Sequence, residues 1–216
     1  FMLPNYVIID AELSYSLPPH ITAASGMDAL SQAVESYWAV KSTEESKKFA
    51  SEAIILILEA LQDAVAGGKQ AKITMSKAAH LAGKAINITT TTAPHAISYP
   101  ITTYFGLQHG HAVSLILGYF FEINYNFQDI DIVDCRGGEY IKKTMKEIYS
   151  MFGVKSGLEC KNRWHHLMDG IGLDRNIQSV GIQTEDDIDK IINDIDLQRL
   201  KNNPVRVSIN KLKEVL

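Results

Sequence analysis

Cysteine is scarce in this sequence of 216 residues, which holds only Cys135 and Cys160. Two cysteines in a chain of this size do not make a disulfide framework, and their wide separation does not fit a metal-binding cysteine pair. Disulfides are rare in reducing compartments, so this usage favours a cytoplasmic protein. With 46% hydrophobic residues, the chain is long enough to bury a large core without cross-links.

The sequence also has no large excess of either positive or negative charge. The 21 Lys and Arg residues are balanced by 25 Asp and Glu residues, and the net charge is -4. A nucleic-acid-binding surface needs a concentrated basic patch or stripe. The lysine-containing runs at 41–48 and 161–164 are short and mixed with acidic or polar residues, which is typical of a solvated helix face. We therefore expect no nucleic-acid partner.

Long hydrophobic runs are absent as well. The longest predominantly apolar stretches, residues 53–61 and 112–121, fall short of the ~18 to 20 residues that a membrane-spanning helix needs. The sequence opens without a charged segment followed by an apolar one, so no leader peptide is expected. These absences predict a soluble protein with no membrane partner.

Two further patterns are missing. Neither of the glycine-rich phosphate loops, GxGxxG or GxxxxGK, occurs, so a dinucleotide would have to be held mainly by groups outside this sequence. The opening FMLPNYVIIDAELSYSLPPH begins without an initiator Met and reads as a strand plus turn with no partner strand nearby. We predict a piece of a longer protein, with a strand and linker at 1–17 and a helical domain at 18–216.

Helical periodicity fills most of the chain after residue 19. Segment 93–106 has a helical pattern that we expect to be interrupted at Pro100 and Gly106. The fold class is therefore mainly α. Other helices are expected at 22–40, 42–68, 71–88, 109–126, 137–153, 162–173, 184–200 and, capped near Ser208, in the tail at 202–216.

Two helix starts carry capping signals. Ser25 is a candidate N-cap of the first long helix. Ser42 or Thr43, followed by Glu45, resembles a capping box, and the same helix is expected to stop at the Gly-Gly pair at 67–68.

Asp28 and Gln32 lie four residues apart on a predicted helix, so their side chains project from the same face on successive turns. A carboxylate oxygen and an amide oxygen at this spacing could both reach one cation. A solvated helix edge is the alternative interpretation, although the surrounding residues in MDALSQAVESYW are mostly apolar.

Three of the seven histidines fall in the stretch TTTTAPHAISYPITTYFGLQHGH, residues 89–111. His95 and His109 would be ~21 Å apart along one continuous helix, whereas two ligands of one metal each lie ~2.0 to 2.1 Å from it. The chain must therefore fold back between them to make a shared site, and Pro100 and Gly106 supply breaks that would allow this. A polar loop with satisfied, partly buried rings is the alternative.

Asp28, His95 and His109 together offer one carboxylate and two imidazoles, a ligand set associated with iron(II) and acceptable to zinc. Gln32 would be a weak neutral fourth ligand. We hypothesise a metal site built from these four residues.

Three segments, as a set, resemble a known family. They are LPPHITAASGMDALSQAVESYWA, HLAGKAINITTTTAPHAISY and GLQHGHAVSL. They are similar to the C-terminal helical domain of the iron-containing (group III) alcohol dehydrogenases, in the superfamily that also contains glycerol dehydrogenase and dehydroquinate synthase. The resemblance runs from about residue 5 to the terminal NNPVRVS segment.

This resemblance implies a fold, cofactors and ligands. It implies the mainly α C-terminal domain of the dehydroquinate synthase-like fold, and an N-terminal nucleotide-binding domain, missing from this sequence, that would hold NAD(P)(H). The family's metal ligands fall on Asp28, Gln32, His95 and His109, with Fe²⁺ favoured and Zn²⁺ as the alternative. The chain has Gln32 where the family's second ligand is histidine, and Tyr99 where many members have a histidine near the nicotinamide.

Within the family, the motifs are most similar to the phosphonoacetaldehyde reductase (hydroxyethylphosphonate dehydrogenase) branch. Lys84 and Asn87 are the predicted substrate-binding residues, since a lysine could pair with a phosphonate dianion; a lysine that extends to solvent is the alternative. Tyr99 or His111 could relay the proton that the product alkoxide needs. Tyr99 is also predicted to contact the nicotinamide cofactor.

Two other functions stay open. The HGHAV segment resembles the HGEAV segment of dehydroquinate synthase, a lyase, although that enzyme's glutamate ligand and basic substrate-binding residues have no clear match here. The chain could also be a helical assembly module without activity of its own. As partners we expect a small aldehyde or alcohol and the missing nucleotide-binding domain. A homodimer of two copies is a further alternative.

Overall fold

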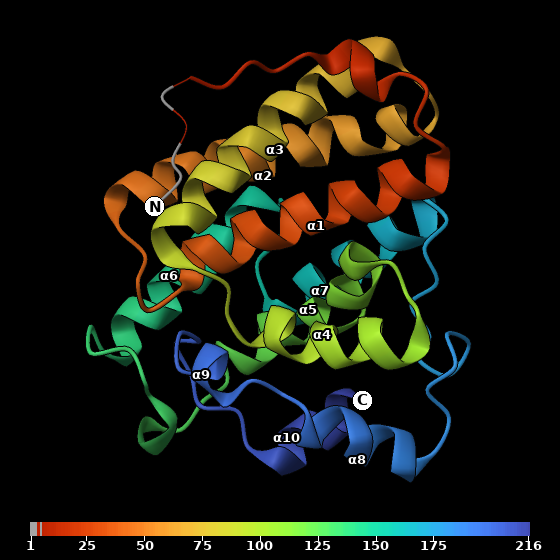
Figure 1. Cartoon of the computed structure of the whole chain (residues 1–216). Coiled ribbons are helices and arrows are strands. Elements are labelled where there is room, and N and C mark those ends of the chain that lie inside the picture. The colour runs from red at the N-terminus through yellow and green to blue at the C-terminus, as the bar shows by residue number, and fades with distance from the viewer. Residues whose placement is uncertain (1–3, 5) are drawn as a thin grey trace.

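The structure, a computed structural model, describes residue 4 and residues 6–216 of the chain. The described part is built from α-helices and two short 3-10 helices, without a sheet (Figure 1). The mainly α fold class is therefore confirmed. The elements are η1 (Ala11–Ser14), α1 (Pro19–Trp38), α2 (Glu44–Val65), α3 (Lys69–Thr89), α4 (Ala93–Phe105), α5 (His109–Ile123), η2 (Asp129–Asp131), α6 (Gly138–Met151), α7 (Gly157–Gly170), α8 (Glu185–Asn193), α9 (Leu197–Leu200) and α10 (Ile209–Val215).

The strand predicted at the front of the chain is not formed by the described residues. Residues 6–10 are irregular, and the 3-10 helix η1 follows them; residues 1–3 and 5 of the predicted strand lie outside the described residues. A strand needs a partner for its backbone N–H and C=O groups, and within the described chain the only such pairing is an isolated antiparallel bridge between Ile132 and Val205. The chain that follows, between η1 and α1, is held by the buried Lys72 of α3, whose ammonium donates to the backbone carbonyls of Ser14 and Leu17.

Helix α1 crosses the middle of the molecule, with α2 and α3 on one side and α4, α5 and α7 on the other (Figure 1). Gly26 allows the close approach on the first side, because a Cβ at this position would lie 2.3 Å from Leu61 of α2. The apolar faces of the helices merge into one hydrophobic core. Both faces of α1 are therefore buried for much of its length, which places its polar side chains inside the fold.

The helix starts follow the predicted chemistry only in part. Thr43 caps α2 in a capping box as expected, but its partner is Ser46, not Glu45. The prediction of Ser25 as an N-cap is wrong, because α1 already begins at Pro19, and the Ser25 hydroxyl donates to the Ile21 carbonyl inside the helix. A proline suits the first helical turn, where its missing N–H has no intrahelical partner to lose.

The predicted interruption at Pro100 is also wrong. Pro100 lies inside α4, which continues to Phe105, because one proline removes a single hydrogen bond and the rest of the helix keeps its own. Gly106 ends the helix as predicted, with a left-handed φ of 68° that suits glycine. A short turn then leads into α5, so Gly106 alone reverses the chain between the two histidine segments.

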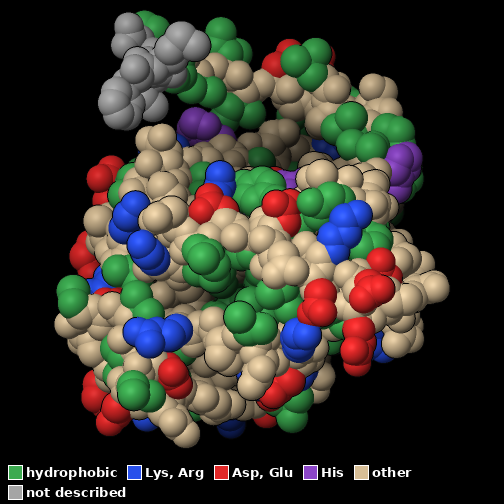
Figure 2. Space-filling view, turned by 60° about the horizontal axis from the view of Figure 1, so that its bottom comes forward, with side chains coloured by type: hydrophobic (Ala, Val, Ile, Leu, Met, Phe, Trp, Pro, Cys, Tyr) green, Lys and Arg blue, Asp and Glu red, His purple; other side chains and the backbone are tan. Residues whose placement is uncertain are grey.

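The C-terminal third packs smaller helices around this frame. The predicted helix at 184–200 is divided into α8 and α9, and Asp196 caps α9 by accepting from the backbone N–H of Gln198. Ser208 caps the last helix as predicted. Figure 2 shows a face on which basic and acidic side chains are intermixed, without a continuous basic stripe. No helix in the described part of the chain is both long and apolar enough to cross a bilayer.

Candidate metal centre

Three helices bring potential ligands to one point. Asp28 comes from α1, His95 from the first turn of α4 and His109 from the first residue of α5. One ligand atom of each lies within 4.8 Å of the others. Asp28 Oδ1 is 3.3 Å from His95 Nε2 and 3.8 Å from His109 Nε2. The two histidines therefore do not lie in a polar loop; they lie at the starts of two helices, and their rings converge on one carboxylate.

Two glycines make this convergence possible. Gly106 supplies the turn that folds α5 back beside α4. Gly110 lies against α1 so closely that a Cβ there would be 1.9 Å from the Ala24 carbonyl oxygen and 2.8 Å from Asp28 Cβ. Only a residue without a side chain lets α5 approach α1 this closely, which brings His109 to Asp28.

The residues fit a divalent cation. Asp28 Oδ1 and His95 Nε2 are buried atoms for which the described residues provide no hydrogen-bond partner, and an unsatisfied buried polar atom costs about 1–3 kcal/mol. Ligands bonded at ~2.0 to 2.1 Å in a tetrahedral arrangement lie roughly 3.4 Å apart. The 3.3 Å between Asp28 Oδ1 and His95 Nε2 matches that spacing, and the 3.8 Å from Asp28 Oδ1 to His109 Nε2 is slightly longer. A cation at this point would satisfy both buried atoms and relieve the contact between them.

Glu35, which the sequence did not single out, holds His95 in place. Its carboxylate is fully buried two turns beyond Asp28 on α1 and accepts from Thr92 N at 2.9 Å and Thr92 Oγ1 at 2.7 Å. Its other oxygen contacts His95 Nδ1. Trp38 extends the network by donating to Thr92 Oγ1. A carboxylate that accepts a hydrogen bond from Nδ1–H keeps the proton on that nitrogen and leaves the Nε2 lone pair free for a metal.

The two histidines have different electrostatic surroundings. Burial alone would lower the pKa of His95, but the carboxylates of Glu35 and Asp28 raise this pKa to about 9. Burial lowers the pKa of His109, against the opposing charge of Asp28. His95 is thus held between two carboxylates, whereas His109 lies at the half-exposed side of the cluster.

Gln32 is beside the cluster but contacts Asp28. Its Nε2 donates to Asp28 Oδ2 at 2.9 Å, so the amide nitrogen, not the oxygen, faces the carboxylate. This bond occupies the Asp28 oxygen that does not face the histidines. The role of Gln32 as a fourth ligand stays a prediction, and it requires the amide group to turn its oxygen toward the cluster.

Tyr99 reaches the cluster and His111 does not. The Tyr99 ring stacks on His109 with a centroid distance of 5.2 Å, and its hydroxyl accepts from Arg199 Nη1 at 2.9 Å. His111 Nε2 donates instead to the Asp174 carbonyl at 2.6 Å. Of the two predicted proton relays, therefore, only Tyr99 lies next to the cluster.

The predicted substrate-binding residues Lys84 and Asn87 are exposed on α3. The Lys84 ammonium lies 3.7 Å from the centre of the Phe49 ring. Both residues line an open hollow against the N-terminal segment, together with His80 and Tyr6. The structure does not bring them into the metal cluster, and their role stays a prediction.

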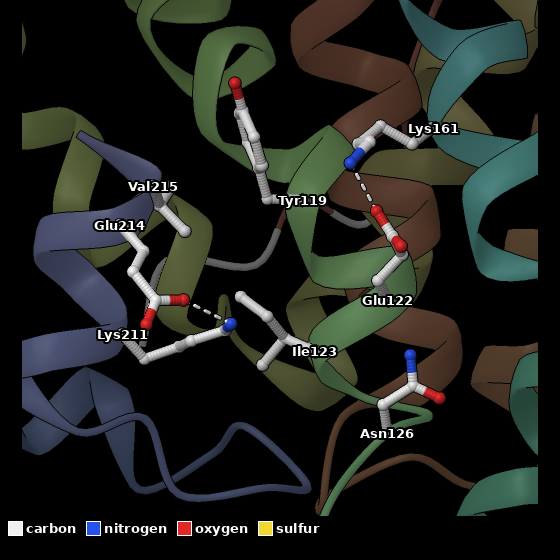
Figure 3. Close-up of a pocket in the computed structure, with 8 residues that line it drawn as sticks. All are labelled: Tyr119, Glu122, Ile123, Asn126, Lys161, Lys211, Glu214 and Val215. Carbon is white, nitrogen blue, oxygen red and sulfur yellow. Dashed lines mark hydrogen bonds and ion pairs between the residues drawn. The ribbon is translucent and has the colours of Figure 1, made fainter.

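A second hollow, of about 240 Å³, lies between α5 and α10 (Figure 3). Its charged groups are paired with one another, Lys161 with Glu122 and Lys211 with Glu214. None of its lining residues belongs to the metal cluster. The paired charges leave no free group that would recognise a charged ligand there.

Comparison with known proteins agrees with the fold. Residues 22–216 match the sequence pattern described as "Fe-containing alcohol dehydrogenase family, C-terminal". The chain therefore belongs to the Fe-containing alcohol dehydrogenase family and corresponds to its C-terminal domain. This confirms the resemblance on which the ligand assignment to Asp28, Gln32, His95 and His109 was based.

Individual relatives span several activities. The chain is 33% identical over 152 residues to phosphonoacetaldehyde reductase from Streptomyces viridochromogenes, covering 69% of this chain and 38% of the relative. It is 31% identical to long-chain-alcohol dehydrogenase 1 from Geobacillus thermodenitrificans, covering 84% and 45%. Among solved structures, sulfoacetaldehyde reductase from Bifidobacterium kashiwanohense in complex with NAD+ is similar with a TM-score of 0.80 and 32% identity, covering 95% and 51%. The chain thus spans about half or less of the length of these relatives.

Proposed function

We propose that this chain is the metal-binding half of an NAD(P)-dependent alcohol dehydrogenase, and that the enzyme reduces phosphonoacetaldehyde to 2-hydroxyethylphosphonate. The observation that carries the proposal is the cluster of Asp28, His95 and His109, with buried ligand atoms that lack hydrogen-bond partners among the described residues. Such a set suits Fe²⁺ or Zn²⁺. The nicotinamide cofactor would be bound mainly by a separate nucleotide-binding domain.

The residues of this chain have separate tasks in the proposed reaction. A divalent cation held by the cluster would supply Lewis-acid polarisation of the aldehyde oxygen. Glu35 fixes the proton of His95 on Nδ1 and so keeps the ring in a ligating orientation. Tyr99, which stacks on His109 and is partly exposed, would pass a proton between solvent and the developing alcohol oxygen.

The choice of substrate rests on the relatives and on two residues of α3. Two relatives at 32–33% identity are named for aldehydes with an anionic head group, a phosphonate in one and a sulfonate in the other. Lys84 and Asn87 are the phosphonate contacts that the resemblance suggests, although the Lys84 ammonium lies over Phe49. A dehydroquinate-synthase-like lyase or an inactive assembly module is the competing proposal.

The metal site can be tested on the chain itself. The purified chain should bind one Zn²⁺ or Fe²⁺ by metal analysis, and Asp28→Ala should lose it. Asp63→Ala, which removes an exposed acid of α2, is the matched control and should keep the metal. Full metal retention by Asp28→Ala would refute the site.

The reaction requires the full-length enzyme. We expect it to oxidise NADH or NADPH when phosphonoacetaldehyde is added, as measured by loss of nicotinamide absorbance. Phosphonate conversion without a net change in the nicotinamide would favour the lyase. Absence of any conversion, with metal bound, would favour the assembly module.

A further inference from the structure

Arg199 lies next to the metal cluster although it is far from the ligands in sequence. It comes from the short helix α9. Its Nη1 donates to the Tyr99 hydroxyl at 2.9 Å, and its guanidinium carbon lies 4.5 Å from the centre of the Tyr99 ring. Tyr99 in turn stacks on His109. Guanidinium, phenol ring and imidazole therefore follow one another from the protein surface to the cluster.

The contacts of the Arg199 guanidinium with neighbouring residues do not use all of its N–H donors. Its Nε reaches Asp196 at 3.3 Å, but both side chains are about half exposed, and exposed ion pairs contribute little to stability. Nη1 also approaches Thr91 Oγ1 at 3.4 Å. Nη2 has no hydrogen-bond partner among the residues that the structure describes. Arg199 thus presents a positive charge and a free donor to the solvent near the metal ligands.

The position suits one end of a small anionic substrate. The two stacking distances place the guanidinium within roughly 10 Å of the His109 ring. A two-carbon spacer is about as long as one extended residue, about 3.5 Å. The planar fork of arginine binds two oxygens of a tetrahedral oxyanion at once. A short aldehyde could therefore contact the cluster with its carbonyl group and Arg199 with its head group.

We propose that Arg199 is the specificity-determining residue of this site, selecting two-carbon aldehydes and alcohols that carry a phosphonate or sulfonate head group. The inference rests on the proposed function, because it takes the metal cluster as the binding site of the carbonyl oxygen. Tyr99 is the positioning residue. Its hydroxyl and ring hold the guanidinium at a fixed distance from His109.

The test is a binding measurement on the Zn²⁺-loaded chain. The chain has five arginines, so the Nε–Hε signal of Arg199 can be assigned in a ¹⁵N NMR spectrum by comparison with Arg199→Lys. The probes are 2-hydroxyethylphosphonate, 2-hydroxyethanesulfonate and, as the neutral comparison, 1-propanol. Both anions should shift the Arg199 signal, and the phosphonate, with its greater charge, should bind more tightly.

The substitutions separate selection from a structural role. Arg199→Gln should weaken binding of both anions by about ten- to a hundredfold, the range of hydrogen bonds to charged groups, and leave 1-propanol unchanged. Arg199→Lys should restore part of the loss. Tyr99→Phe should weaken anion binding less and shift the Arg199 signal. Arg175→Gln, which removes an exposed arginine paired with Asp169, is the matched control and should have no effect.

Several outcomes would overturn the inference. These are no anion binding to the wild-type chain, equal weakening of the neutral and anionic probes by Arg199→Gln, or unchanged anion binding in that variant. The proposed function fails separately, if the full-length enzyme reduces no aldehyde. If that enzyme reduces aldehydes but Arg199→Gln leaves its preference for anionic ones unchanged, only the assignment of Arg199 is wrong.

Discussion

Substitution of Glu35 by glutamine tests how the metal site is held together. The change keeps the size of the side chain and removes its charge. The amide oxygen can still accept from the Thr92 backbone N–H and hydroxyl, as the carboxylate does at 2.9 and 2.7 Å. The amide nitrogen then takes the place of the oxygen that contacts His95 Nδ1. Two donors would face each other unless His95 moved its proton to Nε2, the nitrogen that points at Asp28.

Either response should impair metal binding. A ring that turns away no longer ligates, and a proton on Nε2 blocks the lone pair that the metal needs. Loss of a carboxylate behind a ligating histidine weakens metal affinity by about 10- to 100-fold, which corresponds to about 1.4 to 2.7 kcal/mol. We expect a loss in this range for Glu35→Gln, measured by titrating Zn²⁺ against a competing chelator.

A matched control separates metal binding from general destabilisation. Glu147→Gln removes a carboxylate that contacts Lys47 and Tyr37 away from the cluster, so it should leave Zn²⁺ affinity unchanged. Urea unfolding of the metal-free variants gives the stability change on its own. Wild-type affinity in Glu35→Gln would show that Glu35 does not set the orientation of His95.

Two further predictions concern packing and thiol reactivity. Gly110→Ala places a Cβ 1.9 Å from the Ala24 carbonyl oxygen, so we expect a loss of stability of about 1–3 kcal/mol or more in urea unfolding together with weaker Zn²⁺ binding. The control is Gly83→Ala, where a Cβ meets open space and should not destabilise the fold. Equal behaviour of the two variants would contradict the close approach of α5 to α1. Burial raises the pKa of the Cys160 thiol, and only the thiolate reacts, so iodoacetamide at about pH 8 should modify the exposed Cys135 and leave Cys160 unmodified until guanidinium chloride unfolds the chain. Mass spectrometry measures the modification. Rapid modification of both thiols in the folded chain would show that Cys160 is accessible.

Helical periodicity predicted most of the fold because burial of an apolar face leaves a local pattern in the sequence. The errors arose where a residue's local preference was outweighed by its neighbours. Pro100 removes only one hydrogen bond from a helix whose buried side chains hold it together. Ser25 has a capping side chain, but the helix had already started at Pro19, more than one turn earlier. The described residues at the front form no strand, because strand pairing depends on segments that the local pattern does not contain.

The candidate ligands, whose role stays a prediction, were found in the sequence through the family motifs, whereas the residues that support them were not. Glu35 had a signal that was not used, because it is an acidic residue seven positions after Asp28 on the same helix face. Arg199 had none. It reaches Tyr99 only through the tertiary fold, from a four-residue helix whose sequence is typical of a solvated segment.

The single His95 ring lies between two carboxylates of one helix, with Nε2 toward Asp28 and Nδ1 toward Glu35. This arrangement limits how the sequence of α1 can vary. Inserting or deleting one residue between the two acids would rotate one of them by about 100° about the helix axis relative to the other, and the ring could no longer contact both. Loops away from the cluster and from the turn at Gly106 can change length without this penalty. The seven-residue interval should therefore be inherited as a unit, and a gap inside it in any homologue would mark a protein that has lost the site.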